Sequence, residues 1–203
     1  MANLVAMTYS MMTALALFAF VTSITPGPNN LMLMASGARF GFRLSLPHMF
    51  GISLGFGVLI FAVGMGLAAV LETVAWAEFA LKMLAAGFLA RLAWKLAHAG
   101  APGQAGQRDR PMGLMHAALF QWINPKGWMM ALTAIAVYAP EQSVQTILAV
   151  TLVFVLVNFP SVGVWTLIGG RIGRVLQDPA RARLFNLAMA GLLLATLFPI
   201  LTG

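Results

Sequence analysis

The sequence has very few charged residues. Only 12 basic and 5 acidic side chains occur in 203 residues, so charged residues make up 8% of the chain, whereas a soluble domain carries about a quarter. Apolar residues make up 61%, and the mean hydropathy is +0.89. Such a chain cannot cover a water-facing surface with polar groups. It is therefore predicted to be an integral membrane protein.

Cysteine is absent, which excludes disulfides, thiol redox chemistry and thiolate metal sites. The three histidines, His48, His98 and His116, do not have the spacing of metal ligands. No nucleophile with a neighbouring base is visible, so neither an enzyme nor a bound cofactor is expected. The first basic residue is Arg39, and the N-terminus therefore lacks the basic region of a cleaved signal peptide.

The apolar residues form six blocks, each long enough to cross a bilayer. They lie at about residues 8–38, 45–70, 74–97, 113–138, 144–169 and 184–201. Inside lipid each block must be helical, because a spanning barrel would need alternating polar residues that are missing here. The chain is thus predicted to be an all-α membrane protein with six transmembrane helices in a single domain, residues 1–203.

The basic residues gather on one side of this predicted topology. Ten of the twelve lie in the connections after the first, third and fifth blocks or beside them, whereas the other connections hold Glu72, Glu78 and Glu141. This distribution predicts that the basic connections are cytoplasmic and that both termini lie outside. The net charge is +7. We interpret the basic residues as orienting the chain in the membrane and contacting anionic lipid, not as binding nucleic acid.

A polar stretch at about residues 98–112 separates two halves of three blocks each. Because three is odd, the halves, about 1–98 and 113–203, must enter the membrane with opposite orientation. Inverted repeats are a common plan of secondary transporters, whose substrate site lies near the midplane where discontinuous helices meet. We therefore expect two inverted three-helix repeats joined by a cytoplasmic loop.

Both halves carry a break at a matching place. The first block is interrupted by residues 25–30 (Thr-Pro-Gly-Pro-Asn-Asn) and the fourth by residues 124–127 (Asn-Pro-Lys-Gly). Proline ends one helical segment and suits the first turn of the next, so Thr25 and Asn124 are predicted as N-caps of the second segments. One proline in a membrane helix usually means only a kink, but two breaks in corresponding helices 1 and 4 indicate a site.

The broken helices predict a site for a carboxylate. Each break would present free backbone N–H groups and the positive end of a helix dipole near the bilayer centre. Lys126 adds a full positive charge at the same depth, which is costly without a partner or a water-filled cavity. The expected partner is the carboxylate of a small-molecule substrate.

The amino group of such a substrate would need neutral acceptors, because all five acidic residues lie in loops or at helix ends. Asn158, which precedes Pro160 in an expected third break, has two equal interpretations: a wall of the site, or an interhelical hydrogen bond. A dicationic substrate is poorly matched, and a neutral amino acid, including a hydrophobic one, is expected. The predicted substrate-binding residues are Thr25, Pro26, Gly27, Pro28, Asn29, Asn30, Gln121, Asn124, Pro125, Lys126, Gly127 and Asn158.

The break motifs resemble those of the lysine-exporter (LysE/RhtB-type) translocators. The resemblance rests on residues 25–55, with Pro26-Gly27-Pro28-Asn29 and glycines at 37, 41, 51 and 55, and on Asn124-Pro125-Lys126; Leu81-Lys82 and Phe88-Leu89 also fit. It covers essentially the whole chain. It implies a six-span exporter of amino acids or related metabolites in the bacterial inner membrane, driven by protons.

Several alternatives remain open. The glycine pairs 37/41, 51/55 and 169/173 are explained by close helix packing alone. A channel would pass solute only down its gradient, and a structural protein would tolerate loss of Lys126 or Pro125. The substrate could be a metabolite other than an amino acid, whereas a metal exporter would need ligands that the spans lack. The sequence does not identify which residue carries protons. It is also compatible with a homo-oligomer.

Overall fold

The computed structural model describes residues 9–100 and 110–198, and every element within these stretches is helical. The terminal residues and most of the loop predicted at 98–112 lie outside the described residues. The elements are α1 (Tyr9–Ile24), α2 (Pro28–Gly64), α3 (Leu67–Glu72), α4 (Ala77–Ala97), α5 (Leu114–Phe120), the short 3₁₀ helix η1 (Gln121–Ile123), α6 (Pro125–Tyr138), α7 (Val144–Gly173) and α8 (Pro179–Ala195).

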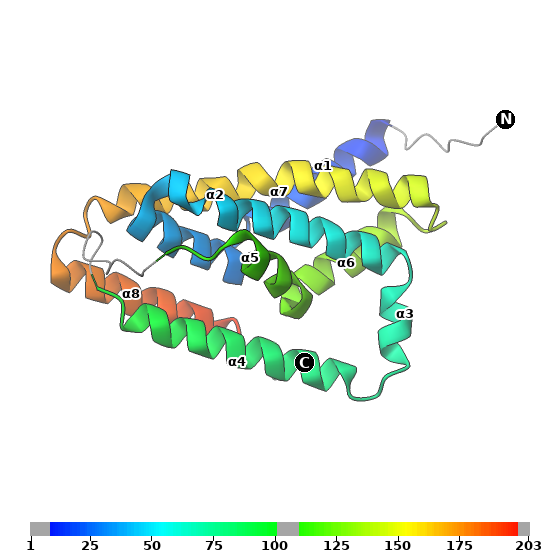
Figure 1. Ribbon diagram of the computed structural model, residues 1–203. Coiled ribbons are helices and arrows are strands. Elements are labelled where there is room, and N and C mark those ends of the chain that lie inside the picture. Colours follow the sequence, from blue (N-terminus) through cyan, green and yellow to red (C-terminus); the bar gives the residue numbers. More distant parts are fainter. Residues whose placement is uncertain (1–8, 101–109, 199–203) are drawn as a thin grey trace.

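The helices form a main bundle with a helix pair along its edge. In the bundle, α7 packs against both α1 and α2, and α5 and α6 also contact α2. The pair consists of α4 and α8, which lie side by side at the lower edge of Figure 1. α2 and α7 are each long and apolar enough to cross a membrane, and shorter apolar helices lie at Tyr9–Ile24 and Leu114–Ile123.

The predicted blocks correspond to these helices with differences at their ends. The first block is α1 plus the start of α2, and the fourth is α5, η1 and α6. The second block, predicted at about 45–70, is too long, since α2 ends at Gly64 and α3 is a separate short helix. The sixth starts at Pro179 rather than at residue 184, because the Asp178 side chain caps the backbone N–H of Arg181 and Pro179 suits the first turn.

Gly41 turns α2 back on itself. The helix has 37 residues, which at 1.5 Å per residue would span about 55 Å, far more than the ~30 Å of a bilayer core. Gly41 has φ 76° and ψ 175°, a conformation that glycine adopts without a Cβ penalty. The chain reverses there (Figure 1), and the hydroxyl oxygens of Ser36 and Ser45 lie 2.8 Å apart across the turn. Residues 28–40 and 42–64 are therefore two separate segments.

Glycines bring α7 against the first segment of α2. A Cβ at Gly169 would overlap the backbone carbonyl of Met34, and one at Gly37 would overlap that of Thr166. Gly51 and Gly55 make similar approaches to α5. The predicted close packing is confirmed at these glycines, but Gly41 serves the turn instead, with no atom near its Cβ position.

We expect Gly169→Ala to destabilise the fold. The new methyl group would meet backbone, which cannot rotate away, so the two helices must separate at a cost of about 1–3 kcal/mol. Gly191→Ala in α8 is the matched control, because nothing lies within 4 Å of its Cβ position. Thermal unfolding of the purified proteins in detergent measures both changes. Equal melting temperatures for the two variants would contradict the packing described here.

Candidate functional site

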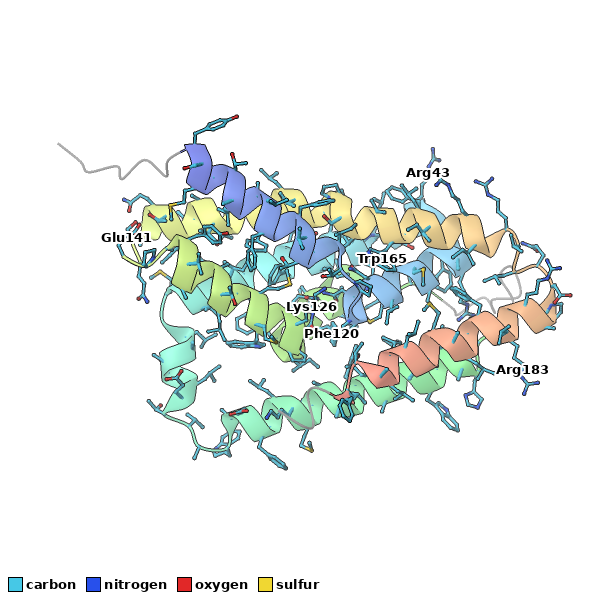
Figure 2. The ribbon with its side chains drawn as sticks, turned by 180° about the vertical axis from the view of Figure 1, so that it is seen from behind. Arg43, Phe120, Lys126, Glu141, Trp165 and Arg183 are labelled. Atoms are coloured by element: carbon cyan, nitrogen blue, oxygen red, sulfur yellow. The ribbon has the colours of Figure 1, made fainter. Side chains whose placement is uncertain are left out.

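The two breaks lie against each other near the middle of the bundle. Figure 2 shows Lys126 between the ends of the molecule marked by Arg43 and Glu141. A Cβ at Gly27 would lie 2.9 Å from Cδ of Lys126. Asn29 Nδ2 donates to Gln121 Oε1 (2.8 Å), and Gln121 Nε2 donates back to Asn29 Oδ1 (3.2 Å). The structure thus brings the predicted residues of both halves together.

The helix after the first break starts later than predicted. α2 begins at Pro28 with Gly27, not Thr25, at the N-cap position. Thr25 belongs to the end of α1, because its hydroxyl donates to the carbonyl of Thr22 (2.9 Å) and its N–H to that of Val21 (3.2 Å). The prediction of Thr25 as an N-cap is therefore wrong, since the second proline of the motif, and not the first, opens the helix.

The helix after the second break starts where the sequence predicts. α6 begins at Pro125 with Asn124 at the N-cap position. The Asn124 side chain does not cap the helix; its Nδ2 donates to Gln121 Oε1 at 3.4 Å. In the first turns of both α2 and α6 the backbone N–H groups have no carbonyl of their own helix within reach. Two helix starts, with their positive dipole ends, thus border one region.

Side chains from three other helices donate hydrogen bonds to the carbonyl groups at the carboxyl end of α1. Asn30 Nδ2 of α2 donates to the carbonyls of Ser23 (2.9 Å) and Thr25 (2.7 Å). Trp165 Nε1 of α7 donates to the carbonyl of Ile24 (3.0 Å). Lys126 of α6 reaches the same end. An unpaired carbonyl in an apolar interior costs several kcal/mol, so these contacts allow the break to exist inside the bundle.

Within the protein, Lys126 is held by the end of α1. Its ammonium group donates to the carbonyl of Thr25 (2.7 Å), the hydroxyl of Thr25 (2.9 Å) and the carbonyl of Pro26 (3.4 Å). An ammonium has three donors, so all are directed at the end of α1 in this conformation. The carboxyl end of a helix carries partial negative charge, which stabilises the lysine without a carboxylate.

A small cavity lies between the two breaks, with a volume of about 30 Å³. Nine of the twelve predicted residues line it: Gly27, Pro28, Asn29, Asn30, Gln121, Asn124, Lys126, Gly127 and Asn158. Thr25, Pro26 and Pro125 do not, since the first two supply oxygens to Lys126 and the third starts α6. The volume holds about one water molecule, so an amino acid does not fit in this conformation.

Five further residues line the cavity: Thr22, Ser23, Phe56, Met130 and Val162. Helical periodicity could have found two of them, because Met130 follows Gly127 by three residues and Val162 follows Asn158 by four, which places each on the same helix face. Thr22 and Ser23 lie in the turn before the first break. Phe56 comes from the second segment of α2, and no local pattern links it to the site.

Asn158 combines both of the roles that the sequence leaves open. Its Oδ1 accepts from Ser53 Oγ (2.9 Å), its Nδ2 donates to Ser23 Oγ (3.2 Å), and it lines the cavity. It therefore joins α7 to α1 and α2. The expected third break is wrong, because α7 continues from Val144 to Gly173 with Pro160 inside it.

One buried acceptor of the site is unpaired. Asn124 is 3% exposed, and its Oδ1 has no hydrogen-bond partner among the described residues. A buried unpaired polar group costs about 1–3 kcal/mol, and a donor entering the cavity would relieve this cost. None of the described residues that line the cavity is acidic. Residues 9–100 and 110–198 also contain no group of three or more His, Asp or Glu that could hold a metal ion.

We expect Lys126→Met to lower stability by about 1–3 kcal/mol, because the hydroxyl of Thr25 and the carbonyl of Pro26 lose their donor. Lys82→Met is the matched control. Lys82 forms a surface ion pair with Glu78 (2.8 Å) one turn away on α4, a contact worth about 0.5 kcal/mol or less. Thermal unfolding in detergent checks both values, and an equal effect of the two variants would show that Lys126 does not hold the break.

Comparisons with known proteins agree with the resemblance of the break motifs. The chain is 27% identical over 196 residues to the cysteine/O-acetylserine efflux protein of Salmonella typhimurium (strain LT2), covering 92% of this chain and 95% of that protein. It is also 27% identical over 191 residues to the protein of the same name from Escherichia coli O1:K1, with 92% and 95% covered. No solved structure matches significantly. A family model described as LysE type translocator matches residues 20–198, which include both breaks, and the chain therefore belongs to the LysE-type translocator family.

Proposed function

We propose that the protein is a secondary transporter that exports neutral amino acids, of the size of cysteine and O-acetylserine, from the cytoplasm. The observation that carries this proposal is the cavity in which the starts of α2 and α6 meet neutral amide side chains. The family, and the relatives named for efflux of cysteine and O-acetylserine, support an amino-acid substrate.

The substrate carboxylate binds at the two helix starts. The backbone N–H groups at Asn29, Asn30 and Gly127 and the dipoles of both helices favour an anion. Lys126 lines the same cavity but is held by α1. A carboxylate beside Gly27 would compete with the carbonyls of Thr25 and Pro26 for this ammonium. Substrate binding would then weaken one of the contacts that hold the end of α1.

The substrate amino group binds Asn124 Oδ1, the unpaired acceptor. The other lining amides, Asn29, Asn30, Gln121 and Asn158, already have side-chain or backbone partners. The α-ammonium group of a substrate can therefore donate to a neutral oxygen. A second, side-chain ammonium group would have no acidic acceptor among the described residues around the cavity. This favours neutral substrates over lysine or arginine.

Transport requires the site to open, because the cavity is too small for an amino acid. The end of α1 is held by Asn30, Trp165 and Lys126, which belong to three different helices. Exchange of these few hydrogen bonds would allow the end of α1 to move relative to α2, α6 and α7. We propose that the site opens alternately to the two sides of the membrane by movement around the breaks. We also propose that the proton gradient drives export.

We further propose a single domain, residues 1–203, of six spans in two inverted repeats, about 1–98 and 113–203, joined by a cytoplasmic loop at about 98–112. Counterparts in the two halves contact each other, since α2 packs on α7, α4 on α8, and the first break on the second. Arg43 and Arg183 mark one end of the molecule and Glu141 the other (Figure 2). The basic end would face the cytoplasm of a bacterial cell and both termini the exterior.

The transport proposal is tested in bacteria that lack their own exporters and are fed dipeptides, which release amino acids inside the cell. We expect cells with the wild-type protein to release neutral amino acids several-fold faster than empty cells, and lysine no faster. Asn124→Leu should reduce this release about tenfold or more, as expected for loss of one hydrogen bond to a charged group. A protonophore should abolish export against a gradient.

The control is Asn186→Leu at equal membrane level. Asn186 is also a buried amide, but it donates to the carbonyl of Ala99 (2.7 Å) and does not line the cavity. Preferred release of lysine would refute the neutral specificity. Equal release of every solute by wild type and Asn124→Leu would indicate a channel, and no release above empty cells would indicate a substrate other than an amino acid.

The topology is tested with single cysteines, since the chain has none of its own. Thr73 and Gln177 are exposed in the turns before α4 and before α8. We expect Thr73→Cys to react with a membrane-impermeant maleimide in intact cells, and Gln177→Cys to react only after the membrane is permeabilised. Labelling of both from the same side would rule out the six-span arrangement.

A further inference from the structure

We propose that a second, larger cavity binds an anionic phosphate ester at the basic end of the molecule. This basic cavity has a volume of about 400 Å³, against about 30 Å³ for the cavity between the breaks. It lies among the first segment of α2, the carboxyl-terminal half of α4 and the stretch leading into α5. Its ligand is not a transported amino acid, so the inference goes beyond the proposed function.

Cations from three separate parts of the chain line the basic cavity. They are Arg39, Arg91, Lys95 and Arg110. None of the described residues that line it is acidic; Asp109, which precedes Arg110 in the sequence, lies outside the described residues. Arg91, Lys95 and Arg110, gathered around one cavity, repel each other unless an anion lies between them. Arginine is well suited to phosphate because its planar group can donate two parallel hydrogen bonds.

His48 supplies an independent sign of a ligand. It is 2% exposed and lines the basic cavity. Neither ring nitrogen has a hydrogen-bond partner among the described residues. Buried polar side chains nearly always have partners, and an oxygen atom of a ligand in the cavity would accept a hydrogen bond from the imidazole N–H. The site therefore offers a buried hydrogen-bond donor together with several cations.

The apolar part of the lining defines the rest of the ligand. It includes Met32, Phe88, Leu92 and Leu193, and Phe88 and Leu92 lie on the same face of α4 as Arg91 and Lys95, because they are three or four residues apart. A zwitterionic amino acid would bring an ammonium group among the cations, and free phosphate would leave the apolar side chains uncovered. A phosphate ester with an apolar group contacts both the cations and the apolar side chains. The head group of an anionic phospholipid has this combination, and basic pockets between membrane helices bind such head groups on the cytoplasmic side.

The experiment measures binding to the purified full-length protein in neutral detergent, from the shift in thermal unfolding with ligand concentration. The ligands are dihexanoyl phosphatidylglycerol, zwitterionic dihexanoyl phosphatidylcholine and glycerol phosphate. We expect phosphatidylglycerol to bind at least about tenfold more tightly than phosphatidylcholine, and Arg91→Gln/Lys95→Gln to remove this difference, as expected for loss of charge-assisted hydrogen bonds. Binding of glycerol phosphate as tight as that of phosphatidylglycerol would identify a soluble ester as the ligand.

The matched control is Arg181→Gln/Arg183→Gln, which removes the same charge from the exposed start of α8, outside the basic cavity. Figure 2 shows Arg183 at the same end of the molecule. Equal weakening by both double variants, equal affinity for the two lipids, or displacement of phosphatidylglycerol by a neutral amino acid would overturn the proposal. If the cavity variant does not fold, His48→Phe provides the test, and it should also weaken phosphatidylglycerol binding relative to the control.

Discussion

A helix that ends inside a bundle leaves carbonyl groups without partners in their own helix, and the centre of this protein is arranged around that constraint. α1 ends at Ile24, and the carbonyls of Ser23, Ile24, Thr25 and Pro26 accept hydrogen bonds from Asn30, Trp165 and Lys126. Because these donors come from α2, α7 and α6, satisfying one helix end also fixes how four helices meet. The break is therefore a structural junction as well as the candidate site.

The same junction explains how a binding site and a moving part can share residues. Gln121 links the second break to Asn29 of the first, and Lys126 joins α6 to the end of α1. These contacts are few and polar, whereas the surrounding core of Phe56, Phe154 and their neighbours is apolar and close-packed. Hydrogen bonds can be exchanged for bonds to a substrate with little net cost, while packed glycine contacts such as Gly169 on Met34 resist separation. Motion is thus expected at the end of α1 rather than between α2 and α7, since Leu15 and Ala19 of α1 belong to the same apolar core.

The two cavities differ in the chemistry that they offer. The cavity between the breaks is lined by neutral amides and helix starts, with one ammonium that is already bound. The basic cavity is lined by both cations and apolar side chains. A zwitterion suits the first and an anionic amphiphile the second. Phe88 and Phe120, whose ring centroids are 4.7 Å apart, stack beside the basic cavity.

The amino-acid sequence by itself determined the membrane class, the helical blocks and the position of both breaks, because composition, proline and glycine act locally on the backbone. Asn124 and Pro125 start α6 as local rules predict. Only the tertiary structure decided that Pro28 opens α2, that α7 continues through Pro160, and that Lys126 binds the end of α1. The contacts at the end of α1 depend on which donors lie near each free carbonyl, and these donors come from residues as much as 141 positions away in the sequence. Local patterns do not contain that information.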